Sequence, residues 1–174
     1  RTYGNGDADF GALIAGVDRV QQQLCSKVRA GQNYPELHLE AHRLLAGVLA
    51  EQDIVRMSPE AMVAEAVTST FFPHGLGHPI GLQVHDVAGF HANEAGDTIP
   101  RPAGHPFLRM TRTLEANFVV TIEPGLYFIP MLLAQLKAGP HAAHVNWSKV
   151  DHLTKFGGIR IEHEVRATTG IPEN

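Results

Sequence analysis

The stretch FFPHGLGHP, residues 71–79, constrains the fold and chemistry of this sequence more than any other. His74 and His78 lie in it, and His85-Asp86 follows, so that three imidazoles fall within twelve residues. The glycines and prolines between them exclude an ordinary helix and allow a backbone or a ligand to approach closely. Because neutral imidazole is the commonest side-chain ligand of divalent metals, the stretch predicts a metal site.

Two carboxylates follow in runs where an ionised side chain is costly. Glu123 lies in TIEPG, residues 121–125, and Glu162 lies in GIRIE, residues 158–162. An ionised glutamate in an apolar, β-branched run needs a cation or hydrogen-bond donors to offset its desolvation. Together with one histidine, these two glutamates predict half or more of a hydrolytic centre for a hard metal.

Each of these residues also has a simpler interpretation. A single histidine beside a glycine is more often a turn residue than a ligand. In an extended strand Ile159 and Ile161 share one face, while Arg160 and Glu162 share the other, which can simply be solvated. The hypothesis of a metal site therefore depends on three blocks that occur together and in order, and not on any one residue.

Apolar periodicity predicts three helices in the first third of the chain. Asp9 is expected to cap the first, which ends near Gly31, and the second begins at Pro35 and extends to Leu49. A short third helix is expected to begin after Ser58, which can cap it. The two long helices are amphipathic, and we expect them to cover a sheet.

Strands are expected later in the sequence, at about Gly81–Val87, Phe118–Glu123 and Gly158–Ala167. Residues 91–106 are rich in Gly, Pro and polar side chains and predict a long loop. Residues 138–148 predict a surface insertion.

The remaining histidines and the one cysteine favour structural roles. His38 and His42 have the i, i+4 spacing that can chelate a metal, but no Glu follows His38, so the HExxH zinc-peptidase pattern is absent. Both flank an apolar stripe and are predicted to be surface residues. His141 and His144 are predicted to be solvated loop residues, and Cys25 is predicted to be buried in packing.

Length, charge and hydropathy exclude several other classes of protein. A chain of 174 residues is long enough for one domain with a core, and a net charge of −4 gives no basic surface for nucleic acid. No apolar run approaches the length of a membrane span, and Arg1 does not open a signal peptide. One cysteine excludes an internal disulfide, and these features together predict a cytoplasmic location.

The blocks resemble the signature of the pita-bread metallopeptidases, the group that contains methionine aminopeptidase, aminopeptidase P, creatinase and prolidase. Four stretches are most similar to those of bacterial Xaa-Pro dipeptidases, or prolidases: residues 71–79, 81–90, 121–128 and 156–162. The likeness runs from Arg1-Thr2-Tyr3 over nearly the whole chain. It implies an α+β pita-bread fold that is truncated at its N-terminus, with residues 1–174 forming the C-terminal part of the catalytic domain.

The resemblance also implies metal ligands. His78 matches the metal-ligating histidine, Glu123 and Glu162 match two glutamate ligands, and Glu162 matches the one that bridges both metals. It implies two divalent ions, with Mn²⁺ preferred and Co²⁺ or Zn²⁺ as alternatives, because a carboxylate-rich set with one histidine is a hard site. Two aspartate ligands of the family pattern would lie upstream of the first residue, and Asp7 and Asp9 instead match the turn into the next helix.

Further residues match positions that contact the substrate in the family. His85 matches the histidine that contacts the scissile carbonyl, and His74 matches one that lines the substrate pocket. Arg109 matches the arginine that holds the free carboxylate of the dipeptide, and Arg160 matches an arginine beside the bridging glutamate. Glu123 is expected to pass a proton to the departing amine as well as to bind metal.

The activity that the resemblance implies is hydrolysis of Xaa-Pro dipeptides by a hydroxide shared between two metals, in a complete enzyme that is a homodimer. With two ligands upstream of the sequence, this chain alone is expected to hold its metals incompletely and to be inactive. Three alternatives stay open: an aminopeptidase P, an organophosphate-hydrolysing prolidase, and a non-catalytic chain that binds at most one metal or associates with another chain. His163 departs from the family pattern, which usually has an acidic residue there.

Overall fold

A computed structural model describes residues 2–4 and 6–174; Arg1, with which the family resemblance begins, and Asn5 lie outside the described residues. The chain forms two compact units, and two of the boundaries between them fall inside its two long helices. Unit 1 comprises Arg1–Val20, His42–Pro73 and Gly125–Ile161, and unit 2 comprises Gln21–Ala41, His74–Pro124 and Glu162–Asn174. The assignment of residues 1–174 to one part of a catalytic domain stays a prediction.

The two predicted long helices are present as α1 (Ala8–Cys25) and α2 (Tyr34–Glu51). Their apolar stripes are buried, as the periodicity predicted. The expected cap at Asp9 is wrong, because the side chain of Asp7 accepts the hydrogen bond from the Phe10 N–H at 3.0 Å. The first helix also ends earlier than predicted. After Cys25 the chain tightens through i→i−3 hydrogen bonds and then turns at Gly31, whose φ is +87°.

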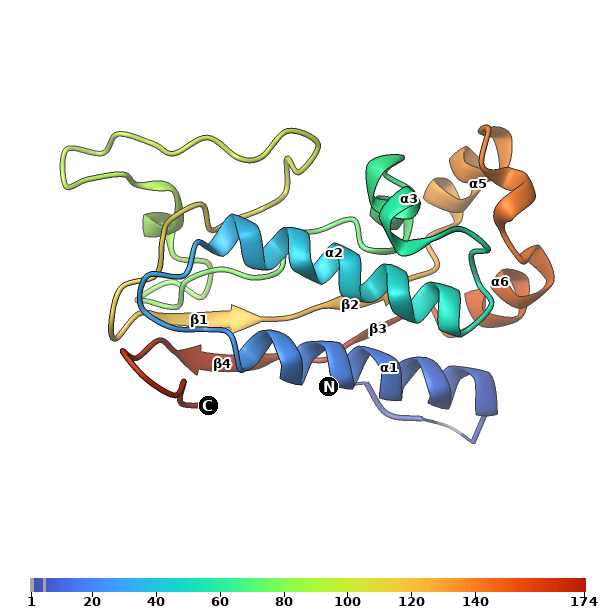
Figure 1. Cartoon of the computed structure of the whole chain (residues 1–174), viewed down its shortest axis with the longest axis horizontal. Coiled ribbons are helices and arrows are strands. Elements are labelled where there is room, and N and C mark those ends of the chain that lie inside the picture. The colour runs from blue at the N-terminus through green and yellow to red at the C-terminus, as the bar shows by residue number, and fades with distance from the viewer. Residues whose placement is uncertain (1, 5) are drawn as a thin grey trace. The chain divides into compact units, whose positions relative to one another are not determined.

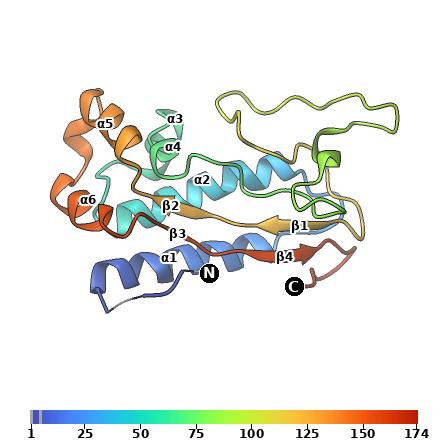
Figure 2. The ribbon, with the colours of Figure 1, turned by 180° about the vertical axis from the view of Figure 1, so that it is seen from behind.

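Unit 1 contains most of the shorter helices. The predicted helix after Ser58 is confirmed as α3 (Pro59–Ala64), and the Ser58 side chain accepts from the Ala61 N–H. The helices α4 (Thr68–Phe71), α5 (Pro130–Ala138) and α6 (Trp147–Thr154) were not predicted. Strand β2 (Gly125–Tyr127) pairs antiparallel with β3 (Gly158–Arg160), as Figure 2 shows from behind, and α4 packs against α5 and β2.

The segment of residues 138–148 lies mostly at the surface, as predicted. It contains the end of α5, a 3-10 helix at Ala142–His144 and the start of α6. Val145 is buried and forms an isolated β-bridge with Val55, so this segment is tied to the core of its unit.

Unit 2 is built around strand β1 (Val119–Ile122), which pairs antiparallel with β4 (His163–Arg166) so that Ile122 faces His163 (Figure 1). Along the other edge of β1 runs the segment 76–80, joined by hydrogen bonds from Ile80 N–H to Val119 O and from Glu123 N–H to Leu76 O. The prediction of a strand at residues 118–123 is therefore confirmed.

The predicted strand at residues 158–167 is divided into two. β3 ends at Arg160 and β4 begins at His163, so that Ile161 and Glu162 lie between two ladders with different partners. The interruption leaves Glu162 outside both ladders, next to the start of β4.

The predicted strand at Gly81–Val87 is wrong. Residues 81–85 form a series of bends, and the side chains of Leu82 and Val84 are fully or largely exposed. Asp86 then caps a 3-10 helix, Val87–Phe90, by accepting from the Ala88 N–H at 2.8 Å. In the part of the chain that the structure describes, no segment covers the side chains of Leu82 and Val84 as a strand of a sheet would require.

Residues 91–106 form the expected long loop, which carries one isolated bridge between His91 and Thr98 and no helix or strand. Within residues 2–4 and 6–174, no helix is both long enough and apolar enough to cross a membrane.

Candidate metal centre

The two glutamates of the predicted site lie opposite one another at the end of the β1–β4 ladder. In that ladder Ile122 faces His163, so extending the antiparallel register by one residue places Glu123 opposite Glu162. Glu123 is 7% exposed, while Glu162 is exposed to solvent. The pair therefore presents one carboxylate from the interior of the unit and one from its surface.

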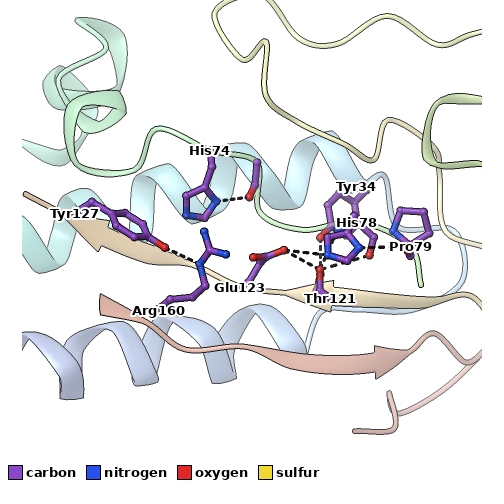
Figure 3. A network of polar contacts seen from close by, with 9 residues as sticks. Tyr34, His74, His78, Pro79, Thr121, Glu123, Tyr127 and Arg160 are labelled. Atoms are coloured by element: carbon purple, nitrogen blue, oxygen red, sulfur yellow. Dashed lines mark hydrogen bonds and ion pairs between the residues drawn. The ribbon is translucent and has the colours of Figure 1, made fainter. Parts of the chain in front are cut away.

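His78 reaches the same place from the segment 76–80. Its side chain is buried, and its Nδ1 lies 3.0 Å from the Pro79 carbonyl oxygen. Because a carbonyl oxygen only accepts, Nδ1 carries the proton and Nε2 keeps its lone pair. That Nε2 faces Glu123 Oε1 at 3.4 Å (Figure 3). The ring is thus held in the tautomer that a metal ligand requires.

One ligand atom each from His78, Glu123 and Glu162 lies within 4.8 Å of the others, although the three residues come from distant parts of the sequence. One imidazole and two carboxylates form a hard, oxygen-dominated donor set that fits a divalent ion such as Mn²⁺ or Co²⁺. The simpler interpretation of the strand also holds in part, because Ile159 and Ile161 are buried and Glu162 is exposed. An exposed face and a ligand position are compatible, since an ion must reach the site from solvent.

The other two histidines of the first block lie on the same segment of chain. The exposed ring of His85 stands edge-on to the ring of His78, with centroids 4.4 Å apart. His74 has its Nδ1 2.7 Å from the Gly75 carbonyl oxygen, so this nitrogen donates. The structure therefore brings His85 directly beside the proposed ligand His78.

Two of the predicted substrate residues are arginines. The segment that carries Arg109 packs tightly on the histidine block: a Cβ on Gly75 would lie 2.9 Å from Phe107 O, and a Cβ on Gly89 would lie 2.2 Å from Arg109 O. The Arg109 side chain is exposed. Arg160 belongs to unit 1, where its Nε donates to the Tyr127 hydroxyl at 2.6 Å (Figure 3).

Two residues that the sequence analysis gave no role complete this part of unit 2. The Tyr34 hydroxyl donates to the Thr121 carbonyl oxygen at 2.6 Å, and the Thr121 hydroxyl lies 3.1 Å from Glu123 Oε1. Burial and then the charge of Glu123 raise the pKa of Tyr34 well above its usual value, so this hydroxyl is a donor. Thr121 could have been found from its i, i+2 spacing to Glu123 in a strand, whereas nothing local marks Tyr34.

The prediction that His38 and His42 are surface residues is wrong, since they are 1% and 2% exposed. In unit 2, His38 Nε2 lies 2.9 Å from Nδ1 of His105, which comes from the long loop. In unit 1, the His42 ring pairs with the Thr68 hydroxyl at 2.8 Å. Helical spacing placed both histidines at the edge of the apolar stripe, but contacts with later segments cover them.

The remaining predictions about polar residues can be compared with the structure directly. Cys25 is buried as predicted, and burial raises the pKa of its thiol to about 11. His144 is exposed as predicted, while His141 is only half-buried and lies 3.5 Å from a Glu65 oxygen. Asp7 caps the start of α1, and its Oδ2 lies 2.8 Å from Nε2 of His152.

Comparison with known sequences fits this geometry. The sequence pattern of metallopeptidase family M24 matches residues 1–169. The chain belongs to this family. It is 56% identical over its whole length to an Xaa-Pro dipeptidase of Xanthomonas euvesicatoria and 53% identical to one of Stenotrophomonas maltophilia. In both comparisons the chain spans 40% of the length of the relative.

Solved structures confirm the predicted α+β pita-bread fold. Aminopeptidase P of Escherichia coli, in a low-pH form, superimposes with a TM-score of 0.69 at 26% identity, covering 97% of this chain and 31% of that one. Proline aminopeptidase P II of Yersinia pestis gives a TM-score of 0.67 at 27% identity with the same coverage. The α+β arrangement that surrounds the site is thus that of a family of metal-dependent peptidases.

Proposed function

We propose that this chain supplies part of the metal centre of an Xaa-Pro dipeptidase. The observation that carries the proposal is the convergence of His78, Glu123 and Glu162, whose ligand atoms lie within 4.8 Å of one another. The M24 match and the 53–56% identity to proteins named Xaa-Pro dipeptidase support the reaction class. The protein would then cleave dipeptides that carry proline at their second position.

His78 would hold a divalent ion through Nε2, and Glu123 and Glu162 would hold it through carboxylate oxygens, with Glu162 bridging to a second ion. We infer Mn²⁺ as the metal, with Co²⁺ and Zn²⁺ as alternatives, because two carboxylates outnumber one imidazole in the set. When bound, such ions activate water at neutral pH and polarise the peptide carbonyl.

The residues around the centre would bind, orient and protonate the substrate. The Glu123 carboxylate would take a proton from the attacking water and deliver it to the departing imino nitrogen. His85, beside His78, would donate a hydrogen bond to the scissile carbonyl oxygen as charge develops there, a contribution of about 3–4 kcal/mol. The guanidinium of Arg109 would pair with the C-terminal carboxylate of the dipeptide, which limits substrates to two residues.

Two further residues would complete the substrate site. His74 would line the pocket, with its ring oriented by the hydrogen bond to Gly75. Arg160 would act beside the bridging glutamate, with its guanidinium oriented by Tyr127. The imino-acid preference would come from a pocket that fits a proline ring.

An aminopeptidase P is the second candidate, because solved aminopeptidases P share the fold at 26–27% identity. The dipeptidase is preferred because identity to the curated dipeptidases is about twice as high. Assays with Ala-Pro, with a tripeptide Xaa-Pro-Xaa and with a phosphotriester separate the two candidates and an organophosphate-hydrolysing relative. Turnover of Ala-Pro alone supports the proposal, and faster turnover of the tripeptide contradicts it.

The metal assignment is tested by the variant Glu162→Gln, which keeps the shape of the side chain and removes its charge. The assays use the longest natural polypeptide that contains these residues and, in parallel, the 174-residue chain. The parent should retain Mn²⁺ after gel filtration, as measured by elemental analysis, and Glu162→Gln should lose at least one ion. Equal metal content in parent and variant contradicts the assignment of Glu162.

The 174-residue chain is expected to show no appreciable turnover of Ala-Pro, because its three candidate ligands carry only two negative charges against two dications. We also propose a cytoplasmic homodimer for the whole enzyme, which light scattering tests. A chain that binds no metal would instead favour a non-catalytic role.

A further inference from the structure

The hydrogen bonding between His78 and Thr121 departs from an ordinary antiparallel ladder. Two residues that face each other in a hydrogen-bonded pair normally exchange two backbone bonds. Here the Thr121 N–H donates to the His78 carbonyl oxygen at 2.9 Å, but the His78 N–H donates to the Thr121 side-chain oxygen at 3.0 Å. One backbone bond of the pair is therefore replaced by a bond to a hydroxyl.

Tyr34 bonds the other polar group of Thr121. Its fully buried hydroxyl donates to the Thr121 carbonyl oxygen at 2.6 Å, so Tyr34 bonds this carbonyl while the His78 N–H bonds the Thr121 hydroxyl (Figure 3). Gly77 makes the approach possible, because a Cβ there would lie 2.1 Å from Thr121 O and 2.5 Å from the Tyr34 hydroxyl. The three residues come from different parts of the chain and meet at a single carbonyl group.

The Thr121 hydroxyl thus lies between two proposed metal ligands. Its oxygen accepts from the His78 N–H, and its proton has two acceptors in reach, Glu123 Oε1 at 3.1 Å and His78 O at 3.5 Å. The carboxylate is the nearer acceptor and the charged one, so it accepts the hydrogen bond from the Thr121 hydroxyl. One hydroxyl thus joins the backbone of His78 to the side chain of Glu123.

We propose that Thr121 and Tyr34 are positioning residues of the metal centre. Thr121 fixes the Glu123 carboxylate relative to His78, and Tyr34 holds the Thr121 carbonyl so that the hydroxyl is available for this purpose. The inference rests on the metal centre proposed above. Neither residue is itself a ligand, and each acts only through the groups that it orients.

The test uses Co²⁺ alone as the probe, because its absorption bands report the geometry of its ligands. Four variants of the longest natural polypeptide that contains these residues are compared with the parent by Co²⁺ titration: Thr121→Val, Thr121→Ser, Tyr34→Phe and Thr68→Val. Thr68→Val is the matched control, since Thr68 is 2% exposed and its hydroxyl bonds His42 in unit 1. Bands that vanish in Glu162→Gln identify the ion at this site.

The expected result is a graded loss of affinity that follows the hydroxyl groups. Thr121→Val should weaken Co²⁺ binding by about 10–100-fold and shift the bands, while Thr121→Ser should stay within about threefold of the parent. Tyr34→Phe should weaken binding by about 3–10-fold with a shift in the same direction. Thr68→Val should bind like the parent.

Three results would overturn the inference. In the first, Thr121→Val keeps the affinity and bands of the parent; in the second, Thr121→Ser is as weak as Thr121→Val, which would make the methyl group responsible. If Thr121→Val does not fold, the test rests on Tyr34→Phe. The third overturning result is then a Tyr34→Phe variant with the Co²⁺ affinity and absorption bands of the parent. A parent polypeptide that binds no Co²⁺ would overturn the proposed metal centre itself, and the positioning role with it.

Discussion

Replacing Gly77 by alanine tests how closely the histidine segment must approach β1. A Cβ at this position would lie 2.1 Å from Thr121 O, 2.5 Å from the Tyr34 hydroxyl and 2.6 Å from Thr121 Oγ1. Two of these atoms belong to Thr121 in the buried end of a ladder and the third to a fully buried ring, so none can move aside freely. The segment that carries His78 must therefore shift by about 1 Å to reach a tolerable separation.

Such overpacking typically costs about 1–3 kcal/mol, and the rigidity of the contacting atoms places Gly77→Ala at about 2–3 kcal/mol. For a chain of this length, that loss lowers the midpoint of thermal unfolding by about 4–12 °C. The same shift separates His78 from Glu123, so Co²⁺ affinity should fall at least about tenfold.

The matched control is Gly47→Ala, because a Cβ on Gly47, inside α2, would meet nothing within 4 Å. This change should raise the unfolding free energy by up to about 1 kcal/mol, since alanine favours helix over glycine. The measurements are thermal unfolding by circular dichroism and Co²⁺ titration of both variants. An unfolding midpoint and a metal affinity equal to the parent's in Gly77→Ala would refute the reasoning.

Three further predictions follow from other residues of unit 2. Burial raises the pKa of Cys25 from 9.0 to about 11, so at pH 8 a chromogenic disulfide should react with this thiol at least about a hundredfold more slowly in the native than in the denatured chain. The stability of the fold should also fall as the pH rises from about 9 towards 11, and equal reaction rates in the two states would contradict the prediction. Burial lowers the pKa of His105, so the unfolded chain binds more protons than the folded one and stability is lost as the pH falls below about 6.5. The denaturant midpoint of His105→Gln should therefore depend less steeply on pH than that of the parent, and an unchanged slope would disprove the role of His105. In a catalytically active polypeptide, Arg109→Ala should lower kcat/KM for Ala-Pro by about 10–100-fold through loss of a charge-assisted bond and leave the amidated dipeptide little affected; equal losses on both substrates would mean that the arginine supports the fold.

The environment of Glu123 gives a physical reason for a cation at this place. Its carboxylate is buried beside Nε2 of His78 and receives a hydrogen bond from Thr121. One hydroxyl bond offsets part of the desolvation of a carboxylate, and a divalent ion would offset much more. Glu162 reaches the same position from an exposed strand end, which leaves a path for the ion from solvent.

Two errors in the sequence predictions have a shared cause. The segment 81–87 alternates like a half-buried strand, yet Leu82 and Val84 are exposed because no neighbouring layer covers them. His38 and His42 lie at the margin of a helical stripe, yet both are buried because later segments of the chain pack over them. In each case the local pattern carries no information about the segments that do or do not pack against it.

The sequence by itself was enough to predict the candidate donor set and the family. The order of His78, Glu123 and Glu162 predicted the donor set, because a buried carboxylate needs compensation wherever it occurs, and the resemblance of residues 71–79, 81–90, 121–128 and 156–162 predicted the family. Periodicity likewise predicted the two long helices, strand β1 and the burial of Cys25, since these depend on neighbours within a few residues.

Only the tertiary structure decided how those residues are held. Tyr34 and Thr121 are 87 positions apart, yet the Tyr34 hydroxyl bonds the Thr121 carbonyl oxygen while the Thr121 hydroxyl accepts from the His78 N–H. No local pattern marks such a contact, because a hydrogen bond between distant segments depends on how helix, strand and loop pack together. Residue type therefore fixed the chemistry available to this protein, and long-range packing fixed the orientation in which the ligands meet.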